Sequence, residues 1–291
     1  MNLAEQVELA RFTTIGTGGP ARWFAEPQTV AELGEALVWA RGEVDVETIG
    51  LGSNVLAHDR GVDALVVRLA GELARVELEG REQVAGGGAT NAVCLRRARD
   101  AGLGGFEFAS AIPGTVGGGV RMNAGAYGRE FRDVLVDALV VNADGQRHLT
   151  ADELELAYRH SSLRPGDVVA EVRLRLEPRE PAEVKARVAA LLAQRKSTQP
   201  TNKRTFGSVW KNPSAQLGAG SAIEQCGLKG HRIGGAVISP RHANFIENAG
   251  DASSADALAV MVEARARVHE RFGVELEHEV RFLGPLELPA L

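Results

Sequence analysis

The stretch ASAIPGTVGGGVRMNAGAYG, residues Ala109–Gly128, decides how the rest of the chain is interpreted. It is rich in glycine and almost uncharged, and Pro113 stiffens its beginning. Glycine has no Cβ and adopts positive φ at little cost, so backbone N–H groups in such a stretch come close to a flat or anionic ligand. The alternative interpretation is a tight turn that joins two buried strands.

The composition is that of an ordinary globular protein. The chain has 291 residues, of which 44% are hydrophobic and 24% are charged, so two or three domains with their own cores are expected. The formal net charge of −5 gives no general attraction to nucleic acid or to an anionic membrane. An anionic ligand therefore needs a local basic site.

The expected location is the cytoplasm. The longest apolar stretches are much shorter than the ~20 residues of a membrane helix, and the first residues, MNLAEQVE, lack the basic and then apolar pattern of an export signal. Cys94 and Cys226 lie far apart in the sequence and form no CxxC motif, which argues against a disulfide framework or a zinc ribbon. We expect both to be small buried apolar residues.

The first half of the chain alternates strand and helix patterns. Thr29 and Glu32 form a capping box before an apolar helical face, and Thr90 is a plausible N-cap for a helix that ends near Gly102. Strand patterns are expected at residues 46–51, 64–69 and 74–78.

The strand at 46–51 runs into GLGSN, Gly50–Asn54, which resembles neither common nucleotide fingerprint. A third glycine is missing at the Rossmann position, and no Gly-Lys-Ser/Thr follows as in a Walker A loop. Two glycines, a serine hydroxyl and an asparagine amide at a strand end can still donate several hydrogen bonds to a diphosphate. A simple turn is the alternative.

Beyond the glycine-rich stretch, residues 134–150 predict a β-hairpin that turns at Asp144 and Gly145. A second capping box, Thr150 with Glu153, predicts a short helix before the Tyr158–Ser161 motif. A strand is expected at 168–176 and a domain boundary between Pro178 and Pro181. Later elements are a helix at 181–194 with Val184, Val188, Leu191 and Leu192 on one face, a helix at 254–272 ended by Gly273, and a last strand at 274–284.

Four motifs occur in one order along the chain: GLGSN, AIPGTVGG with NAGAYG, YRHS, and GSVWKNP, with EVRFLG near the end. This ordered set resembles the UDP-N-acetylenolpyruvoylglucosamine reductase (MurB) family from about Phe12 to Gly284. The segment between Val168 and Ser208 is short and carries no aromatic insertion, so the chain is similar to the shorter subclass, which lacks the substrate-covering insertion.

The resemblance implies an α+β protein with a FAD-binding fold of the vanillyl-alcohol oxidase type and a smaller α+β substrate domain. It implies FAD-binding subdomains at 1–62 and 63–178, a substrate domain at 179–291, non-covalent FAD, and NADPH as the reductant in peptidoglycan precursor synthesis. The residues that it places at FAD are Gly50, Leu51, Gly52, Ser53, Asn54, Val55, Leu56, Ser110, Pro113, Gly114, Thr115, Gly117, Gly118, Asn123, Ala124, Gly125 and Ala126.

Three catalytic residues follow from the resemblance, each with a structural alternative. Ser208 is the expected proton donor, although an isolated serine after glycine is more often a turn residue. Arg159 is expected to stabilise the developing enolate through its fork of donors, although it could be a surface arginine. Glu279 is expected to complete the site, but alternation with Glu275 and Glu277 is also typical of a solvated strand face.

Lys203, Lys211, Asn212 and Arg232 are candidates for the diphosphate of a UDP-sugar, because an acidic protein must concentrate positive charge where such a group docks. The histidines show no HExxH or paired spacing, so no metal is expected. We expect a monomer that binds a small-molecule substrate.

Two other functions fit parts of the pattern. One is another FAD-dependent oxidoreductase of the same superfamily that acts on a small alcohol or hydroxy acid. Such relatives often tether the flavin through His or Cys, and neither residue occurs within Ala109–Gly128. The other is a non-catalytic module that binds flavin or a nucleotide sugar, which would have no need for Arg159, Ser208 and Glu279 together.

Overall fold

The computed structural model describes residues 2–291 and divides the chain into two compact units. The first unit comprises the residues up to Glu5, Trp23–Leu51 and Ala64–Arg195, and the second comprises Gln6–Arg22, Gly52–Asp63 and Lys196–Leu291. The expected division into two FAD-binding subdomains and a substrate domain stays a prediction.

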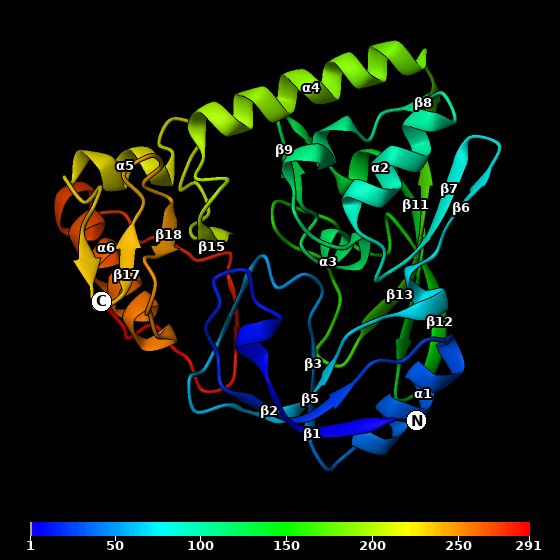
Figure 1. Cartoon of the computed structure of the whole chain (residues 1–291), viewed down its shortest axis with the longest axis horizontal. Helices are drawn as coiled ribbons and strands as arrows, with labels where there is room; N and C mark the ends of the chain where they lie inside the picture. Colours follow the sequence, from blue (N-terminus) through cyan, green and yellow to red (C-terminus); the bar gives the residue numbers. More distant parts are fainter. Residues whose placement is uncertain (1) are drawn as a thin grey trace. The chain divides into compact units, whose positions relative to one another are not determined.

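A five-stranded antiparallel sheet organises the first unit. Its order is β12 (Gly145–Thr150), β11 (Leu135–Asn142), β13 (Val168–Arg175), β7 (Glu82–Gly86) and β6 (Val76–Glu79). The green strands β11, β12 and β13 run beside the cyan β6–β7 hairpin in Figure 1. Asn142 pairs with Gly145 across the predicted turn, which confirms the hairpin.

Helices α2 (Asn91–Asp100) and α3 (Val116–Arg121) pack on this sheet. Thr90 caps α2 as predicted, because its side chain accepts a hydrogen bond from the Val93 N–H. Phe106, Phe108 and Phe131 form an edge-to-face cluster in the core beneath α3, with ring centroids 5.4 to 6.1 Å apart. The glycine-rich stretch is therefore attached to a rigid apolar core.

A second sheet has the order β1 (Leu3–Glu8), β2 (Pro20–Ala25), β5 (Val62–Val67) and β3 (Asp45–Thr48). β3 and β5 are parallel, and α1 (Val30–Ala40) begins at the predicted cap Thr29. Leu33 and Leu37 on α1 are buried in a core with Leu65 and Val67 of β5, as a 3.6-residue apolar period requires.

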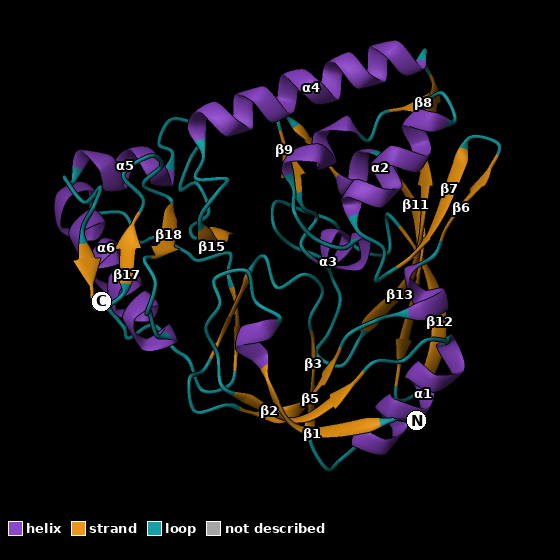
Figure 2. Cartoon of the chain, viewed as in Figure 1, coloured by secondary structure: helices purple, strands orange, loops and turns teal. Residues whose placement is uncertain are grey.

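The second unit is built on an antiparallel sheet with the order β15 (Arg204–Ser208), β18 (Phe245–Asn248), β17 (Ala236–Ile238) and β16 (Arg232–Ile233). Figure 2 shows α5 (Ala219–Gln225) and α6 (Ser254–Phe272) beside these strands. β4 (Val55–Ala57) pairs in parallel with β19 (Arg281–Leu283). The core gathers Trp210, Phe206 and the apolar face of α6.

The remaining elements are short, apart from α4 (Pro181–Thr198). They are the 3₁₀ helices η1 (Leu9–Arg11), η2 (Gly71–Ala74), η3 (Glu107–Ala111) and η4 (Phe131–Asp133), and the two-residue strands β8 (Leu103–Gly104), β9 (Gly125–Ala126), β10 (Arg129–Glu130) and β14 (Glu177–Pro178). No helix within residues 2–291 is long and apolar enough to span a membrane.

Three expectations about these elements were wrong or incomplete. Thr150 and Glu153 do exchange capping hydrogen bonds, but Glu155 has a φ of 47°, so the segment makes one turn instead of a helix. Leu192 is 44% exposed and does not belong to the buried face of α4, which runs through Val184 and Leu191. The last strand is shortened to β19, whereas α6 begins and ends where predicted.

Candidate active site

In the first unit the glycine-rich stretch is packed tightly against neighbouring backbone. A Cβ on Gly117 would lie 2.8 Å from the Gly87 carbonyl oxygen, which is closer than side chains tolerate. The Gly117 N–H donates to that same carbonyl at 2.9 Å. The Gly117 N–H is therefore already bonded within the protein, and the backbone packing alone requires glycine there.

Gly50 and Thr115 bring two of the predicted cofactor loops together in this unit. A Cβ on Gly50 would lie 2.7 Å from Thr115 Oγ1. The following side chain, Leu51, is 38% exposed, and Ser110 Oγ is buried with no hydrogen-bond partner among the described residues. Leu51 from one of these loops and Ser110 from the other supply an apolar side chain and an unpaired hydroxyl, which fit a flat, partly polar cofactor such as a flavin.

Arg159 lies at the tip of a tight turn in the first unit. Ala157 and His160 exchange two backbone hydrogen bonds at 3.2 and 3.0 Å, with Tyr158 and Arg159 between them. Arg159 has a φ of 55°, a value normal for glycine at this turn position and costly for arginine. Its guanidinium donates to the Gly125 carbonyl at 3.1 Å and lies 4.9 Å from the centre of the Tyr158 ring.

The end of the glycine-rich stretch is tied to this turn. The side-chain amide of Asn123, a fully buried residue, donates to the Ala157 carbonyl at 3.0 Å, and its oxygen accepts from the Arg132 N–H. Ala124 continues the loop through backbone bonds to Gly119 and Phe131. The structure thus brings Arg159 of the YRHS motif together with Asn123 and Gly125 of the NAGAYG motif.

In the second unit, Ser208 ends β15 opposite Phe245 of β18. Ser208 is half-buried. The preceding Gly207 has a φ of 81°, so the chain bends sharply just before Ser208. The next two residues are held by Asn244, whose carbonyl accepts from the Val209 N–H. Ser208 therefore occupies a fixed position at the edge of the sheet.

Glu279 lies beside Ser208 in the fold, although 71 positions separate them in the numbering. Its N–H donates to the Val209 carbonyl at 2.9 Å, and its carbonyl accepts from the Asn54 amide at 2.7 Å. The solvated-face alternative fits Glu275 and Glu277, which are exposed, whereas Glu279 is half-buried. The charged face of this segment is thus exposed at Glu275 and Glu277 and partly buried at Glu279, the expected catalytic residue.

The rest of the GLGSN motif lies in this second unit. The Gly52 carbonyl accepts from the Thr14 N–H at 3.1 Å, and the Asn54 carbonyl accepts from the Arg281 N–H at 2.9 Å. Val55 and Leu56 are buried within β4. Asn54 is thus a link to the Glu279 segment, which the sequence did not reveal.

The four basic or amide candidates for the diphosphate differ in their surroundings. The Lys211 ammonium is paired with the exposed Glu277 carboxylate, and Asn212 Oδ1 accepts from the Ala219 N–H at the start of α5. Lys203 is exposed on the loop before β15. Arg232 lies in β16, at the opposite edge of the sheet from the Ser208 strand.

Two hydroxyl groups that fix these positions have partners that no local sequence pattern indicates. Ser161 donates from Oγ to the Arg121 carbonyl at 2.7 Å, and Thr14 Oγ1 donates to the Thr205 carbonyl at 2.6 Å in β15. Their partners are 40 and 191 residues away along the chain. Only the fold reveals such long-range contacts.

Two family models match the chain. Residues 21–150 match the model described as "FAD binding domain", which confirms the expected FAD-binding fold, and residues 199–283 match "UDP-N-acetylenolpyruvoylglucosamine reductase, C-terminal domain". The mixture of sheets and helices in both units agrees with the expected α+β class.

Curated relatives match over nearly the full length. The UDP-N-acetylenolpyruvoylglucosamine reductase of Sphingopyxis alaskensis is 41% identical over 287 residues, covering 98% of this chain and 96% of the relative. That of Rhizorhabdus wittichii is 43% identical over 278 residues, covering 95% and 90%. The crystal structure of the MurB enzyme from Thermus caldophilus has a TM-score of 0.83 at 37% identity and covers 97% of this chain and 98% of that one.

Proposed function

Because this chain belongs to the UDP-N-acetylenolpyruvoylglucosamine reductase family, we propose that it reduces the enolpyruvyl double bond of that nucleotide sugar. The product is UDP-N-acetylmuramate, a precursor of peptidoglycan. NADPH is the hydride donor and FAD is the flavin. The observation that carries the proposal is the 41% identity to a named reductase over 98% of the chain, together with a FAD-binding domain at residues 21–150.

The two loops that meet at Gly50 and Thr115 carry residues that fit FAD. Leu51 would cover an apolar face, and Ser110 Oγ would gain the hydrogen-bond partner that it lacks among the described residues. The backbone of Gly114 and Thr115 would approach the cofactor closely. When bound, FAD accepts a hydride from NADPH and passes it to the substrate.

Arg159 is proposed to stabilise the negative charge that develops on the substrate after hydride transfer. Hydride addition leaves negative charge on the neighbouring carbon, delocalised into its own carboxylate as an enolate, and a guanidinium presents a planar fork of donors to such oxygens. Its attachment to Gly125 and Tyr158 holds the charge in one place before substrate arrives, which is the condition for electrostatic catalysis.

Ser208 is proposed to donate the proton that completes the reduction, and Glu279 to stabilise the enolate together with Arg159. A serine hydroxyl is a weak acid, but a carbanionic enolate is a strong base, so the transfer is downhill once the hydroxyl is positioned. The backbone bond between Glu279 and Val209 supports this pairing, because it places the two residues on adjacent segments. The serine alkoxide is then reprotonated from water.

The diphosphate is proposed to bind Lys203, Lys211, Asn212 and Arg232. We further propose a cytoplasmic monomer with a small-molecule substrate and no nucleic-acid or membrane partner. Lys211 and Asn212 lie three and four residues after Ser208 in the same motif. Of the four candidates, these two therefore have the strongest support as diphosphate ligands. A dianionic group that pairs with Lys211 would compete with the Glu277 carboxylate.

Single-turnover reoxidation of the reduced protein distinguishes the candidate functions. The purified protein should contain FAD, be reduced by NADPH, and be reoxidised rapidly by the enolpyruvyl nucleotide sugar. Reoxidation by a small α-keto acid, but not by the enolpyruvyl compound, would favour another oxidoreductase of the superfamily. A protein that takes up flavin but transfers no hydride would favour the non-catalytic module.

A further inference from the structure

Arg159 is held in a backbone conformation that it would not adopt by itself. A non-glycine residue at a φ of 55° costs on the order of 1 kcal/mol, and such residues persist only where the surrounding structure fixes them. The Ala157–His160 turn is closed by two backbone bonds, which fix its shape but not its place in the unit. Something else must anchor it.

Two side chains anchor the turn, one at each end. At its start, the Asn123 amide donates to the Ala157 carbonyl at 3.0 Å. Just after it, Ser161 Oγ donates to the Arg121 carbonyl, the last residue of α3, at 2.7 Å. Asn123 and the Arg121 carbonyl that accepts from Ser161 both belong to the Ala109–Gly128 stretch, so the turn is fixed to the same stretch that is expected to contact FAD.

Both polar atoms of the Asn123 side chain make hydrogen bonds within the protein. The residue is fully buried, has a φ of 40°, and uses its oxygen to accept from the Arg132 N–H at 3.0 Å. Asparagine tolerates left-handed backbone better than most residues. Asn123, expected from the sequence to contact the cofactor, thus uses both its amide nitrogen and its amide oxygen in hydrogen bonds within the protein.

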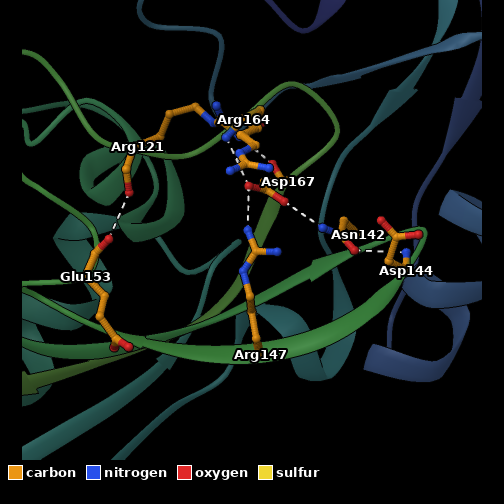
Figure 3. A network of polar contacts seen from close by, with 8 residues as sticks. Arg121, Asn142, Asp144, Arg147, Glu153, Arg164 and Asp167 are labelled. Atoms are coloured by element: carbon orange, nitrogen blue, oxygen red, sulfur yellow. Dashed lines mark hydrogen bonds and ion pairs between the residues drawn. The ribbon is translucent and has the colours of Figure 1, made fainter.

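The Ser161 anchor rests on a second set of polar contacts around Asp167 (Figure 3). The Arg121 guanidinium donates to the Asp167 carbonyl. The Asp167 carboxylate is 2% exposed and accepts from Asn142, from Arg147 and from the Arg164 N–H, at 2.9 to 3.0 Å. The C-terminal end of α3 is therefore held by contacts that do not involve Ser161, and Ser161 links the turn to this fixed end.

We propose that Asn123 and Ser161 are positioning residues for Arg159, which hold its turn so that the guanidinium is preorganised for the anionic intermediate. The inference rests on the proposed role of Arg159. A guanidinium misplaced by about 1 Å loses much of its stabilisation of a developing charge. Loosening the turn should therefore slow the step in which charge develops and leave flavin reduction unchanged.

Ser161→Ala is the first test, with Ser162→Ala as the matched control. Ser162 Oγ makes a similar bond, to the Glu153 carbonyl at 3.0 Å, but not to α3. In the flavin-loaded protein, Ser161→Ala should slow reoxidation by the enolpyruvyl substrate about tenfold. Reduction by NADPH should stay within about twofold, Ser161→Thr should restore the rate, and Ser162→Ala should behave as wild type. Equal losses in both half-reactions, or the same loss in Ser162→Ala, would overturn the proposal.

A double-mutant cycle with Arg159→Lys separates this inference from the proposed function. If Arg159→Lys reoxidises as fast as wild type, the assigned role of Arg159 fails. If Arg159→Lys is slow but Ser161→Ala is fast, the positioning inference alone fails. If both hold, adding Ser161→Ala to Arg159→Lys should cost much less than the tenfold seen in wild type, since a positioning residue acts only through its partner.

Hydrogen exchange gives a readout that does not depend on turnover. The His160 N–H is bonded to the Ala157 carbonyl, which also accepts from Asn123. Asn123→Gly keeps the left-handed backbone accessible but removes the anchor, so amides of the peptide around residues 157–162 should exchange at least tenfold faster in the flavin-loaded protein. Unchanged exchange in both Asn123→Gly and Ser161→Ala would show that neither residue holds the turn.

Discussion

The side chain of Asn244 mimics a neighbouring strand for Trp210. Its oxygen accepts from the Trp210 N–H and its nitrogen donates to the Trp210 carbonyl, both at 2.9 Å. Trp210 is among the largest fully buried side chains of the second unit. Because the Asn244 carbonyl also accepts from the Val209 N–H, one residue fixes the two positions that follow Ser208.

Asn244→Ala is expected to destabilise the protein by about 2 to 6 kcal/mol. The change leaves a buried N–H and a buried carbonyl unpaired, and each costs about 1 to 3 kcal/mol. Chemical denaturation measures the effect, and Asn202→Ala on an exposed loop is the control. If the two variants unfold at the same denaturant concentration, the Asn244 bonds contribute no net stability.

Ser208→Ala tests the proton donor. Reduction of the flavin by NADPH should be unchanged within about twofold, whereas reoxidation by the enolpyruvyl substrate should slow by about 10² to 10⁴, the usual contribution of a general acid. Stopped-flow absorbance of the flavin follows both half-reactions. Ser221→Ala, an exposed serine on α5, is the control, and a Ser208→Ala variant that loses both half-reactions equally would contradict the role.

Arg159→Gly and Arg159→Ala should differ in stability but not in activity. Both remove the guanidinium, so reoxidation should fall by roughly 100-fold, corresponding to about 3 kcal/mol in the barrier. Glycine relieves the strain at a φ of 55°, whereas alanine retains it, so the glycine variant should be about 1 kcal/mol more stable than the alanine variant. Thermal unfolding of the pair decides this, and a more stable alanine variant would mean that the turn is unstrained.

The sequence was a good guide wherever a local pattern fixes the structure. Thr29, Thr90 and Gly273 mark helix ends through bonds to residues within one turn, and all three lie where predicted. The Thr150 capping box shows the limit of such signals. Its hydrogen bonds form, but the left-handed backbone of Glu155 ends the turn before a helix can grow.

The contacts that build the candidate site could not be predicted in the same way. The Asn54 amide donates to the Glu279 carbonyl, 225 residues farther along the chain. The Glu279 N–H donates to the Val209 carbonyl, and Glu279 lies before β19 begins. Neither residue carries a pattern that names the other. The family motifs indicate the candidate residues, and only the fold shows their partners.

The pH dependence of stability should have a contribution from Asp256. The backbone N–H groups of Ser253 and Gly235 donate to its carboxylate and lower its pKa below the ordinary value. A lowered folded-state pKa stabilises the protein above the unfolded value of about 3.9, and this stability is lost as the pH falls through the folded pKa. In Asp256→Asn, the denaturant concentration at the unfolding midpoint should decrease less steeply as the pH is lowered below about 4. Asp251→Asn, an exposed neighbour, should leave the decrease steep; equal slopes for both variants would exclude the contribution.

Gly50→Ala tests the junction between the two predicted cofactor loops. The new Cβ would lie 2.7 Å from Thr115 Oγ1, so one loop must move, and overpacking of this kind costs about 1 to 3 kcal/mol. Because the loops are expected to hold FAD jointly, we expect flavin dissociation to become at least about tenfold more favourable. Gly34→Ala is the matched control, since a Cβ there meets nothing within 4 Å. Gly34 lies within α1, where replacing glycine by alanine should stabilise the helix by about 0.5 to 1 kcal/mol. Fluorescence of released flavin on dilution measures both variants. Tight flavin retention in Gly50→Ala would show that the junction is not part of the cofactor site.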